Sequence, residues 1–229
     1  HYLLENYEIS YLPGADLLRY CTNQRTVSAQ PLDPAQIMQQ SVVLGHSFDN
    51  RLPHTIDEAQ QVAHLTGGQV YLDSCATTTT VRAVAEHCRL LHFATHGDFR
   101  NDNPLFSGLA LDDGWLTTLD IFNLRLTASL VTLSACQTGR HVIGGGDELL
   151  GLMRAFLYAG AKSLVVTLWS VEDCSTAALM AQFYTHLMGG ATKGAALRQA
   201  QLACLRGDQR HAHPFFWAPF FLVGHAGAL

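Results

Sequence analysis

Two apolar runs of strand length, each leading into a reactive side chain and a glycine, limit the folds that this chain can adopt. Leu90–Gly97 carries His96, and Leu130–Gly139 carries Cys136. A buried parallel strand has this kind of unbroken apolar sequence. Ligands of open α/β sheets bind outside the carboxyl ends of the strands. A histidine and a cysteine at that edge are therefore candidates for a nucleophilic pair, because a nearby base favours the reactive thiolate.

Apolar strands alternate with amphipathic helices along most of the chain. A short antiparallel hairpin over Leu105–Trp115, with its turn at Asp112-Asp113-Gly114, interrupts the alternation. The pattern predicts an α/β fold, a three-layer α/β/α sandwich with a mostly parallel central sheet. The expected strands are 41–45, 69–72, the two runs above, 163–168 and 216–223, and the expected helices are 55–65, 78–88, 147–159 (ended by Gly160), 174–188 and 193–206.

The first forty residues have a different character. Tyr7–Pro13 alternates apolar and polar residues, as an edge strand does, and a short helix is expected over 16–21. Residues 22–40 are rich in Thr, Asn, Gln, Ser and Pro, which is typical of a loop. We expect residues 1–40 to form an extension packed on one domain over residues 41–229.

Composition excludes several classes of protein. The net charge is −5, without a Lys/Arg cluster, which argues against direct binding of nucleic acid. The apolar stretch Phe215–Gly224 is too short to span a bilayer, so no membrane partner is expected. Charged residues make up 14% of the chain against about a quarter in an average protein, which suits a domain that packs against a partner. Six cysteines without a CxxC pattern indicate a reducing, cytoplasmic location.

Each candidate also has a structural interpretation. A free cysteine is among the most buried residue types, so Cys136 alone would be a core thiol. Its position before the polar Gln137-Thr138-Gly139 turn instead places the sulfur at the sheet edge, with its own N–H available to an oxyanion. His96 could be a loop residue that caps a strand, but the following Gly97 lets the backbone approach a substrate closely.

A metal or cofactor site is not expected. His92 and His96 lie about 13 Å apart in an extended strand, too far to share a metal ion, and His92 is interpreted as a core histidine. The twelve histidines and six cysteines show no three- or four-ligand zinc spacing. Gly144–Gly146 precedes a helix but lacks the Gly-Lys-Ser/Thr ending of a phosphate loop.

A third polar segment follows another apolar strand and should reach the same edge. It could cap the next helix, contact a substrate, or do both. Its residues are Trp169, Ser170, Val171, Glu172 and Asp173.

Several ordered motifs resemble the CHAT domain, a caspase- and separase-like cysteine peptidase family often attached to tetratricopeptide repeats. They are His96-Gly97, Asn103–Leu111, Ser134–Gly139, Gly146-Asp147-Glu148, Leu168–Asp173 and His213–Phe220. The resemblance implies a caspase-type fold, a dyad of His96 and Cys136, and a peptide-binding groove bordered by Trp169–Asp173. It also implies a regulatory repeat domain or partner protein outside this chain.

We therefore expect a cysteine endopeptidase that acts on protein or peptide substrates. Cys136 would attack the scissile carbonyl, His96 would protonate the leaving amine, and the N–H groups of Gly97 and Cys136 would bind the oxyanion. The glycine-rich segment Arg140–Gly146 is expected to be mobile until a partner activates the domain. Where separases have an acid that selects basic P1 residues, this chain has Ala177, so no strict arginine preference is expected.

Two other functions remain open from the sequence. One is a non-catalytic protein-interaction module with a closed or vestigial site, because the weakly charged surface suits docking. The other is a Cys/His acyl or amido transferase, which uses the same nucleophilic pair.

Overall fold

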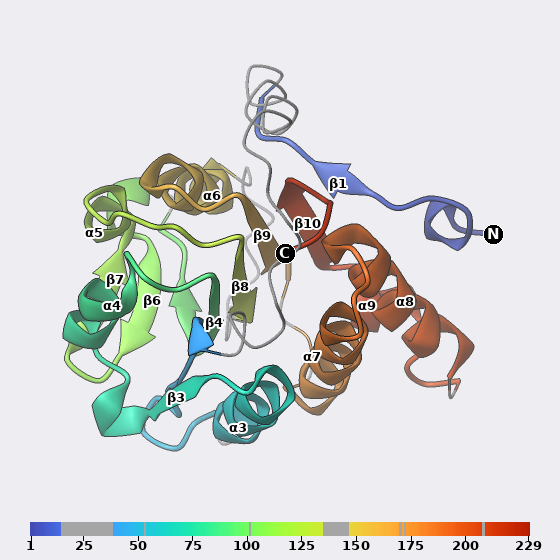
Figure 1. Cartoon of the computed structure of the whole chain (residues 1–229), viewed down its shortest axis with the longest axis horizontal. Coiled ribbons are helices and arrows are strands. Elements are labelled where there is room, and N and C mark those ends of the chain that lie inside the picture. Colours follow the sequence, from blue (N-terminus) through green and yellow to red (C-terminus); the bar gives the residue numbers. More distant parts are fainter. Residues whose placement is uncertain are drawn as a thin grey trace.

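A computed structural model describes residues 1–14, 39–52, 54–100, 102–134, 147–169, 171, 173–207 and 209–229, with the backbone alone at 147–148 and 173–174. The described strands form a seven-stranded sheet in the order β1-β10-β9-β8-β4-β2-β3 (Figure 1). In this sheet β10 runs antiparallel to β9, and the other neighbouring strands are parallel. The strands are β1 (Ser10–Tyr11), β2 (Ser41–Gly45), β3 (Gln69–Leu72), β4 (Leu90–Ala94), β8 (Leu130–Ser134), β9 (Ser163–Thr167) and β10 (Phe220–Gly224).

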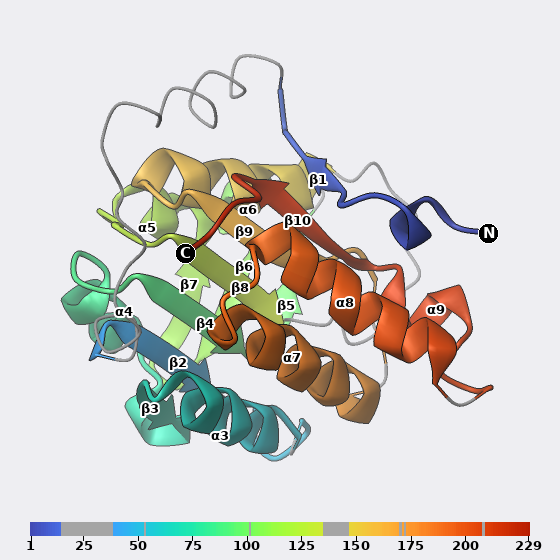
Figure 2. The same cartoon turned by 45° about the vertical axis from the view of Figure 1, so that its right-hand side comes forward.

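Helices cover both faces of this sheet, which confirms the predicted three-layer architecture (Figures 1 and 2). One face carries α3 (His54–Thr66), α7 (Asp173–Met188), α8 (Lys193–Arg206) and the short α9 (Pro214–Trp217). The other face carries α4 (Thr78–Val84), α5 (Thr118–Phe122), α6 (Asp147–Ala159) and a three-stranded antiparallel sheet. That smaller sheet contains β5 (Gly97–Asp98), β6 (Gly108–Leu111) and β7 (Gly114–Thr117).

The central strands are apolar throughout because both of their faces are buried. In β4, Leu91 and Phe93 belong to the core on the α4–α6 side, whereas Leu90 and Ala94 belong to the core on the α3–α7 side. All five residues of β4 and of β8 are buried. The two strands therefore lie at the centre of the molecule, and only their ends can present side chains to a ligand.

Several predicted elements are confirmed at their expected bounds, including β2, β3 and α6. Gly160 ends α6 with a φ of 118°, and a Cβ there would lie 2.2 Å from the carbonyl oxygen of Leu126. The hairpin is also confirmed, since β6 and β7 flank the predicted turn with Leu111 paired to Gly114.

Other bounds were wrong or missed. The last strand begins at Phe220 rather than Phe216, because the His213 ring accepts a hydrogen bond from Phe215 N and Pro214 starts α9. Helix α4 ends at Val84 rather than residue 88. Neither α5 nor β5 was predicted, since five and two residues are too short to show a period.

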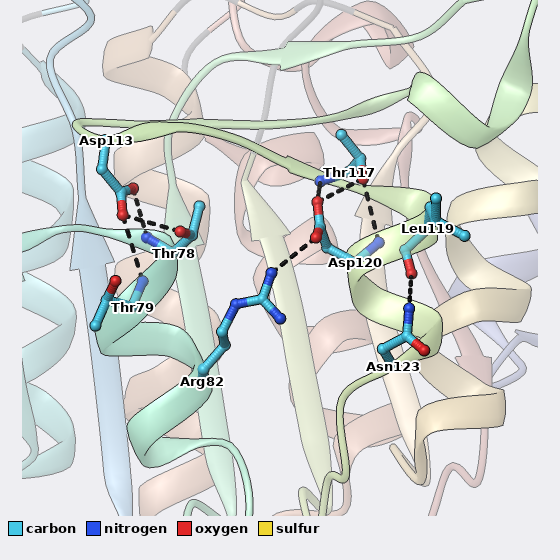
Figure 3. A network of polar contacts seen from close by, with 8 residues as sticks. All are labelled: Thr78, Thr79, Arg82, Asp113, Thr117, Leu119, Asp120 and Asn123. Carbon is cyan, nitrogen blue, oxygen red and sulfur yellow. Dashed lines mark hydrogen bonds and ion pairs between the residues drawn. The ribbon is translucent and has the colours of Figure 1, made fainter.

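Polar contacts join the short elements of the outer layer (Figure 3). The Asp113 carboxylate, in the hairpin turn, accepts hydrogen bonds from Thr78 N at 2.7 Å and Thr78 Oγ1 at 2.9 Å, at the start of α4. Asp120 forms a capping box with Thr117 and an ion pair with Arg82, 2.7 Å from its guanidinium. These contacts hold α4, the hairpin and α5 together at the surface of this layer, above the core to which Val81, Leu116 and Ile121 belong.

Residues 1–14 pack at the edge of the large sheet that β1 forms, opposite the edge formed by β3. Strand β1 pairs with β10, which confirms a strand within Tyr7–Pro13, although it is only two residues long. Arg198 on α8 donates from Nε to Leu4 O at 2.5 Å and from its terminal nitrogen to Glu5 O. The helix expected over 16–21 lies outside the described residues, as does the loop expected over 22–40 up to residue 38.

Candidate active site

His96 lies between the end of β4 and the start of β5, at the carboxyl edge of the central sheet. Ala110 of β6 makes two hydrogen bonds at this position, one with the side chain of Thr95 and one with the backbone of His96. Its carbonyl accepts a hydrogen bond from Thr95 Oγ1 at 2.5 Å, and its N–H donates to His96 O at 2.8 Å. The hairpin, remote in sequence, therefore fixes the backbone that carries the imidazole.

Gly97 follows as the first residue of β5 and is buried. It pairs with Leu109, and because Ala110 N bonds to His96 O, this pair is of the type without its own hydrogen bonds. The Gly97 N–H consequently points away from β6 and is not used by the β5–β6 ladder. An amide in that orientation is suited to an oxyanion, if a substrate carbonyl reaches it.

Two aromatic rings contact the half-buried His96 ring. The Phe48 centroid lies 4.8 Å from it with the ring planes 36° apart, and the Trp115 centroid lies 5.8 Å away in an edge-on arrangement. Phe48 comes from the loop after β2 and Trp115 from β7. Sequence reasoning missed both. The rule that located His96, that residues after a buried strand reach the functional edge, would also have found Phe48.

Cys136 and the segment Arg140–Gly146 lie outside the described residues, which stop at Ser134 on this side. The strand that leads to Cys136 is described. In the β4–β8 ladder, His92 pairs with Thr132 and Ala94 with Ser134. The two strands therefore end at the same level, at the edge of the sheet where His96 lies.

The expected substrate-binding segment follows β9 at the same edge. Trp169 is 38% exposed, and its indole N–H donates to Phe215 O at 3.0 Å, so this bond fixes the ring beside α9. The side chain of Val171 is buried in the core, so any contact of Val171 with a substrate would be made by its backbone. Asp173 begins α7, but its side chain, Ser170 and Glu172 lie outside the described part of the chain.

His92 is a core residue, as interpreted from the sequence. It is fully buried, with Nδ1 3.0 Å from the hydroxyl of Tyr184 and Nε2 3.1 Å from Oε1 of Glu58. Its ring faces the α3–α7 layer, and each of its two nitrogens lies next to one of these residues. Within the described residues, no three His, Cys, Asp or Glu side chains gather closely enough to hold a metal ion.

Among the cysteines whose side chains are described, Cys88 is buried, and burial raises the pKa of its thiol to about 11. It is therefore protonated and unreactive at neutral pH. Cys75 is exposed in the 3₁₀ turn after β3, and Cys204 is partly buried in α8. Of the helices in the described ranges, none is long and apolar enough to cross a membrane.

A family model described as the CHAT domain matches residues 1–225. The chain belongs to the CHAT domain family. The chain is 27% identical over 222 residues to tetratricopeptide repeat protein 28 of Homo sapiens, and 28% identical to that of Mus musculus. Each comparison covers 80% of this chain and 9% of the relative, so this chain spans only a small part of the length of these proteins.

Solved structures with a similar fold include a cysteine proteinase and a separase–securin complex. The crystal structure of the Arg-specific cysteine proteinase gingipain R has a TM-score of 0.59 at 13% identity, covering 87% of this chain and 49% of that one. The Saccharomyces cerevisiae separase–securin complex at 3.0 Å has a TM-score of 0.65 at 13% identity, covering 96% and 14%. At this identity the likeness establishes the caspase-like fold.

Proposed function

We propose that this CHAT domain is a cysteine endopeptidase in which Cys136 is the nucleophile and His96 its general base and acid. The register of β4 and β8 is the observation that carries the proposal. Ala94 pairs with Ser134, and each candidate follows its strand end by two residues. The level ends of these adjacent parallel strands support a dyad of His96 and Cys136 at one edge, and Ala110 holds the backbone at His96.

The chemistry follows from these groups. His96 takes the thiol proton, and the Cys136 sulfur adds to the scissile carbonyl carbon, giving a tetrahedral oxyanion. The N–H of Gly97, together with that of Cys136, donates to this oxygen. When the C–N bond breaks, His96 returns the proton to the leaving amine, and a thioester remains. Water, deprotonated by His96, then attacks the thioester and releases the acid and the free thiol.

An extended peptide would lie along the edge of the sheet at Trp169–Asp173. Within this segment Trp169, Ser170, Val171, Glu172 and Asp173 are the proposed contacts. Ala177, a half-buried residue of α7, supplies no charge for a basic P1 side chain, so we propose no strict arginine preference. The matched relatives are named for tetratricopeptide repeats, which favours a regulatory repeat region or partner protein, with the domain latent in the cytoplasm until activated.

The decisive experiment uses a peptide library made from a digested proteome, with cleavage sites read by mass spectrometry. Cys136→Ala should abolish cleavage while leaving the circular dichroism spectrum and melting temperature unchanged. Cys75→Ala removes an exposed thiol elsewhere and is the matched control, with wild-type cleavage expected. The library is offered with and without a cell extract that supplies activating partners. Cleavage by Cys136→Ala at the wild-type rate would exclude the assigned nucleophile.

A non-catalytic interaction module is the second candidate. Large apolar side chains are exposed on the N-terminal segment, with Leu3 71% and Tyr7 63% exposed, and such residues favour docking on a partner. Labelling with a peptidyl acyloxymethyl ketone separates the two functions, since it requires a reactive thiolate in a substrate groove. Cys136 should be labelled if the domain is a peptidase. No labelling, even with partners present, would favour the module.

A further inference from the structure

The loop after β2 has a backbone that side chains rarely adopt. Phe48, Asp49 and Asn50 have φ values of 51°, 57° and 59°, so three consecutive non-glycine residues are left-handed. Asp73, with a φ of 41°, is the remaining non-glycine residue with positive φ in the described ranges. Such residues cost free energy and persist only where the surrounding structure imposes them.

Three hydrogen bonds hold this loop: one to Asp73, one within the loop and one to β4. Ser47 N donates to Asp73 Oδ1 at 2.8 Å, so the left-handed residues all belong to one assembly. Leu52 N donates to Ser47 O at 2.9 Å and closes the loop. His46 N donates to Ala94 O at 3.0 Å, which ties the start of the loop to the end of β4, two residues before His96.

The result of this geometry is the placement of the Phe48 ring. One of its neighbours is His96, at 4.8 Å between centroids, and another is Trp115, at 6.4 Å. The guanidinium carbon of Arg51 lies 5.3 Å from the centre of the Phe48 ring. Phe48 is therefore packed between the imidazole, the indole and a cation, and the strained backbone keeps it there.

We propose that Phe48 is a positioning residue that sets the orientation of the His96 imidazole for proton transfer with the thiol, an inference that rests on the proposed function. The ring torsion of histidine is broad, so the imidazole needs an external contact to select one orientation. A flat aromatic ring tilted 36° against it provides that contact, and Trp115 limits movement on a second side. The strained loop serves this role, because catalytic groups need to be held to within about 10–20° of the productive orientation.

The test compares Phe48→Leu with Phe48→Tyr in the full chain. Leucine removes the planar contact at similar volume, and tyrosine restores it. For peptide hydrolysis, Phe48→Leu should lower kcat by about tenfold or more with KM within about twofold, because misorientation affects proton transfer rather than binding. Alkylation of Cys136 by iodoacetamide should slow in parallel. Phe48→Tyr should stay within about threefold of the wild type.

Phe122→Leu is the matched control, because it removes one ring of the Phe122–Tyr158 pair, 5.5 Å apart, on α5 and α6. It should leave kcat and the alkylation rate unchanged. If Phe48→Leu does not fold, Asn50→Gly provides the second variant, since it relaxes the loop and keeps the ring. We expect Asn50→Gly to lower kcat without lowering the melting temperature.

NMR of the His96 imidazole C–H groups, assigned with His96→Gln, gives a readout that does not depend on peptidase activity. Phe48→Leu should remove the ring-current shift and broaden these signals. Should the wild type show no cleavage while this change occurs, the proposed function fails and the positioning contact stands. If the wild type cleaves peptides and Phe48→Leu alters neither kcat nor the His96 signals, the positioning role is wrong.

Discussion

His92 Nδ1 lies 3.0 Å from the hydroxyl of Tyr184, and both residues are fully buried. The same hydroxyl donates to Thr132 Oγ1 at 2.8 Å, while Glu58 Oε1 lies 3.1 Å from His92 Nε2, close but not aligned as a hydrogen bond. Four side chains from α3, α7, β4 and β8 thus meet under the sheet. They link the two strands that lead to the candidate dyad.

Tyr184→Phe should destabilise the fold. Burial raises the pKa of Tyr184, so the phenol stays protonated and acts as a hydrogen-bond partner. Its removal leaves Nδ1 of His92 without this partner in the core, which costs about 1–3 kcal/mol of unfolding free energy. Urea denaturation measures the change. Tyr158→Phe, on a ring that is 77% exposed, should be neutral, and equal losses in both variants would argue against the network.

Acid should weaken the outer layer through Asp113 and Asp120. Burial alone would raise the pKa of each carboxyl from its ordinary value near 3.8, but hydrogen bonds from Thr78 and Thr79, and from Thr117 and Arg82, lower both. A lowered pKa means that the stabilisation is present above pH 3.8 and is lost as the pH falls through the folded-state value.

The urea midpoint at pH 7 and at pH 3 measures this effect. Asp113→Asn combined with Asp120→Asn should lower the midpoint at pH 7 and reduce its further fall at pH 3. Asp112→Asn, next to Asp113 in the same exposed turn, is the control and should behave as the wild type. An unchanged pH response in the double variant would contradict the assignment.

Asp49→Gly should stabilise the chain by about 1 kcal/mol, because glycine adopts a φ of 57° without the strain of a Cβ. Thermal and urea unfolding both measure the gain. Gln61→Gly, at an exposed position within α3, separates strain relief from the entropy of glycine and should lose about 1 kcal/mol. Destabilisation of similar size in both variants would show that the loop is not strained.

Arg198→Met should release the N-terminal segment. Its guanidinium binds the carbonyls of Leu4 and Glu5, which lie just before β1. Hydrogen–deuterium exchange of residues 3–11 should become faster, whereas exchange in β4 and β8 stays slow. The control is Arg206→Met, at the exposed end of the same helix. Unchanged exchange in Arg198→Met would mean that β1 pairing alone holds the segment.

Trp169→Leu should weaken substrate binding if the proposed function holds. The variant loses the indole N–H bond to Phe215 O and the exposed ring at the end of β9. We expect KM for peptides to rise several-fold with kcat within about twofold, since Trp169 is proposed to contact the bound peptide rather than to transfer protons. Tyr7→Leu, an exposed aromatic residue of the N-terminal segment, should leave both constants unchanged. A fall in kcat alone would place Trp169 in a different role.

The layers, the first residue of most strands in the large sheet and the edge at which His96 lies could all be predicted from the sequence. A strand buried on both faces is apolar along its length, so β4, β8 and β9 can be predicted from the local sequence pattern. The same local reasoning identified His92 as a core residue, because it lies within such a run. The short elements α5, α9 and β5 carry too few residues for a period and depend on caps and pairing.

The surroundings of the His96 imidazole could not be predicted in this way, because they come from residues distant in sequence. The contact of Phe48 with His96 joins two loops through a left-handed backbone, and although Asp and Asn tolerate this conformation, the preference of Phe gives no sign of it. Its position depends on Asp73, which reaches the loop from the far end of β3. Local pattern fixes what a strand buries, but the orientation of a side chain beyond its end depends on partners distant in sequence.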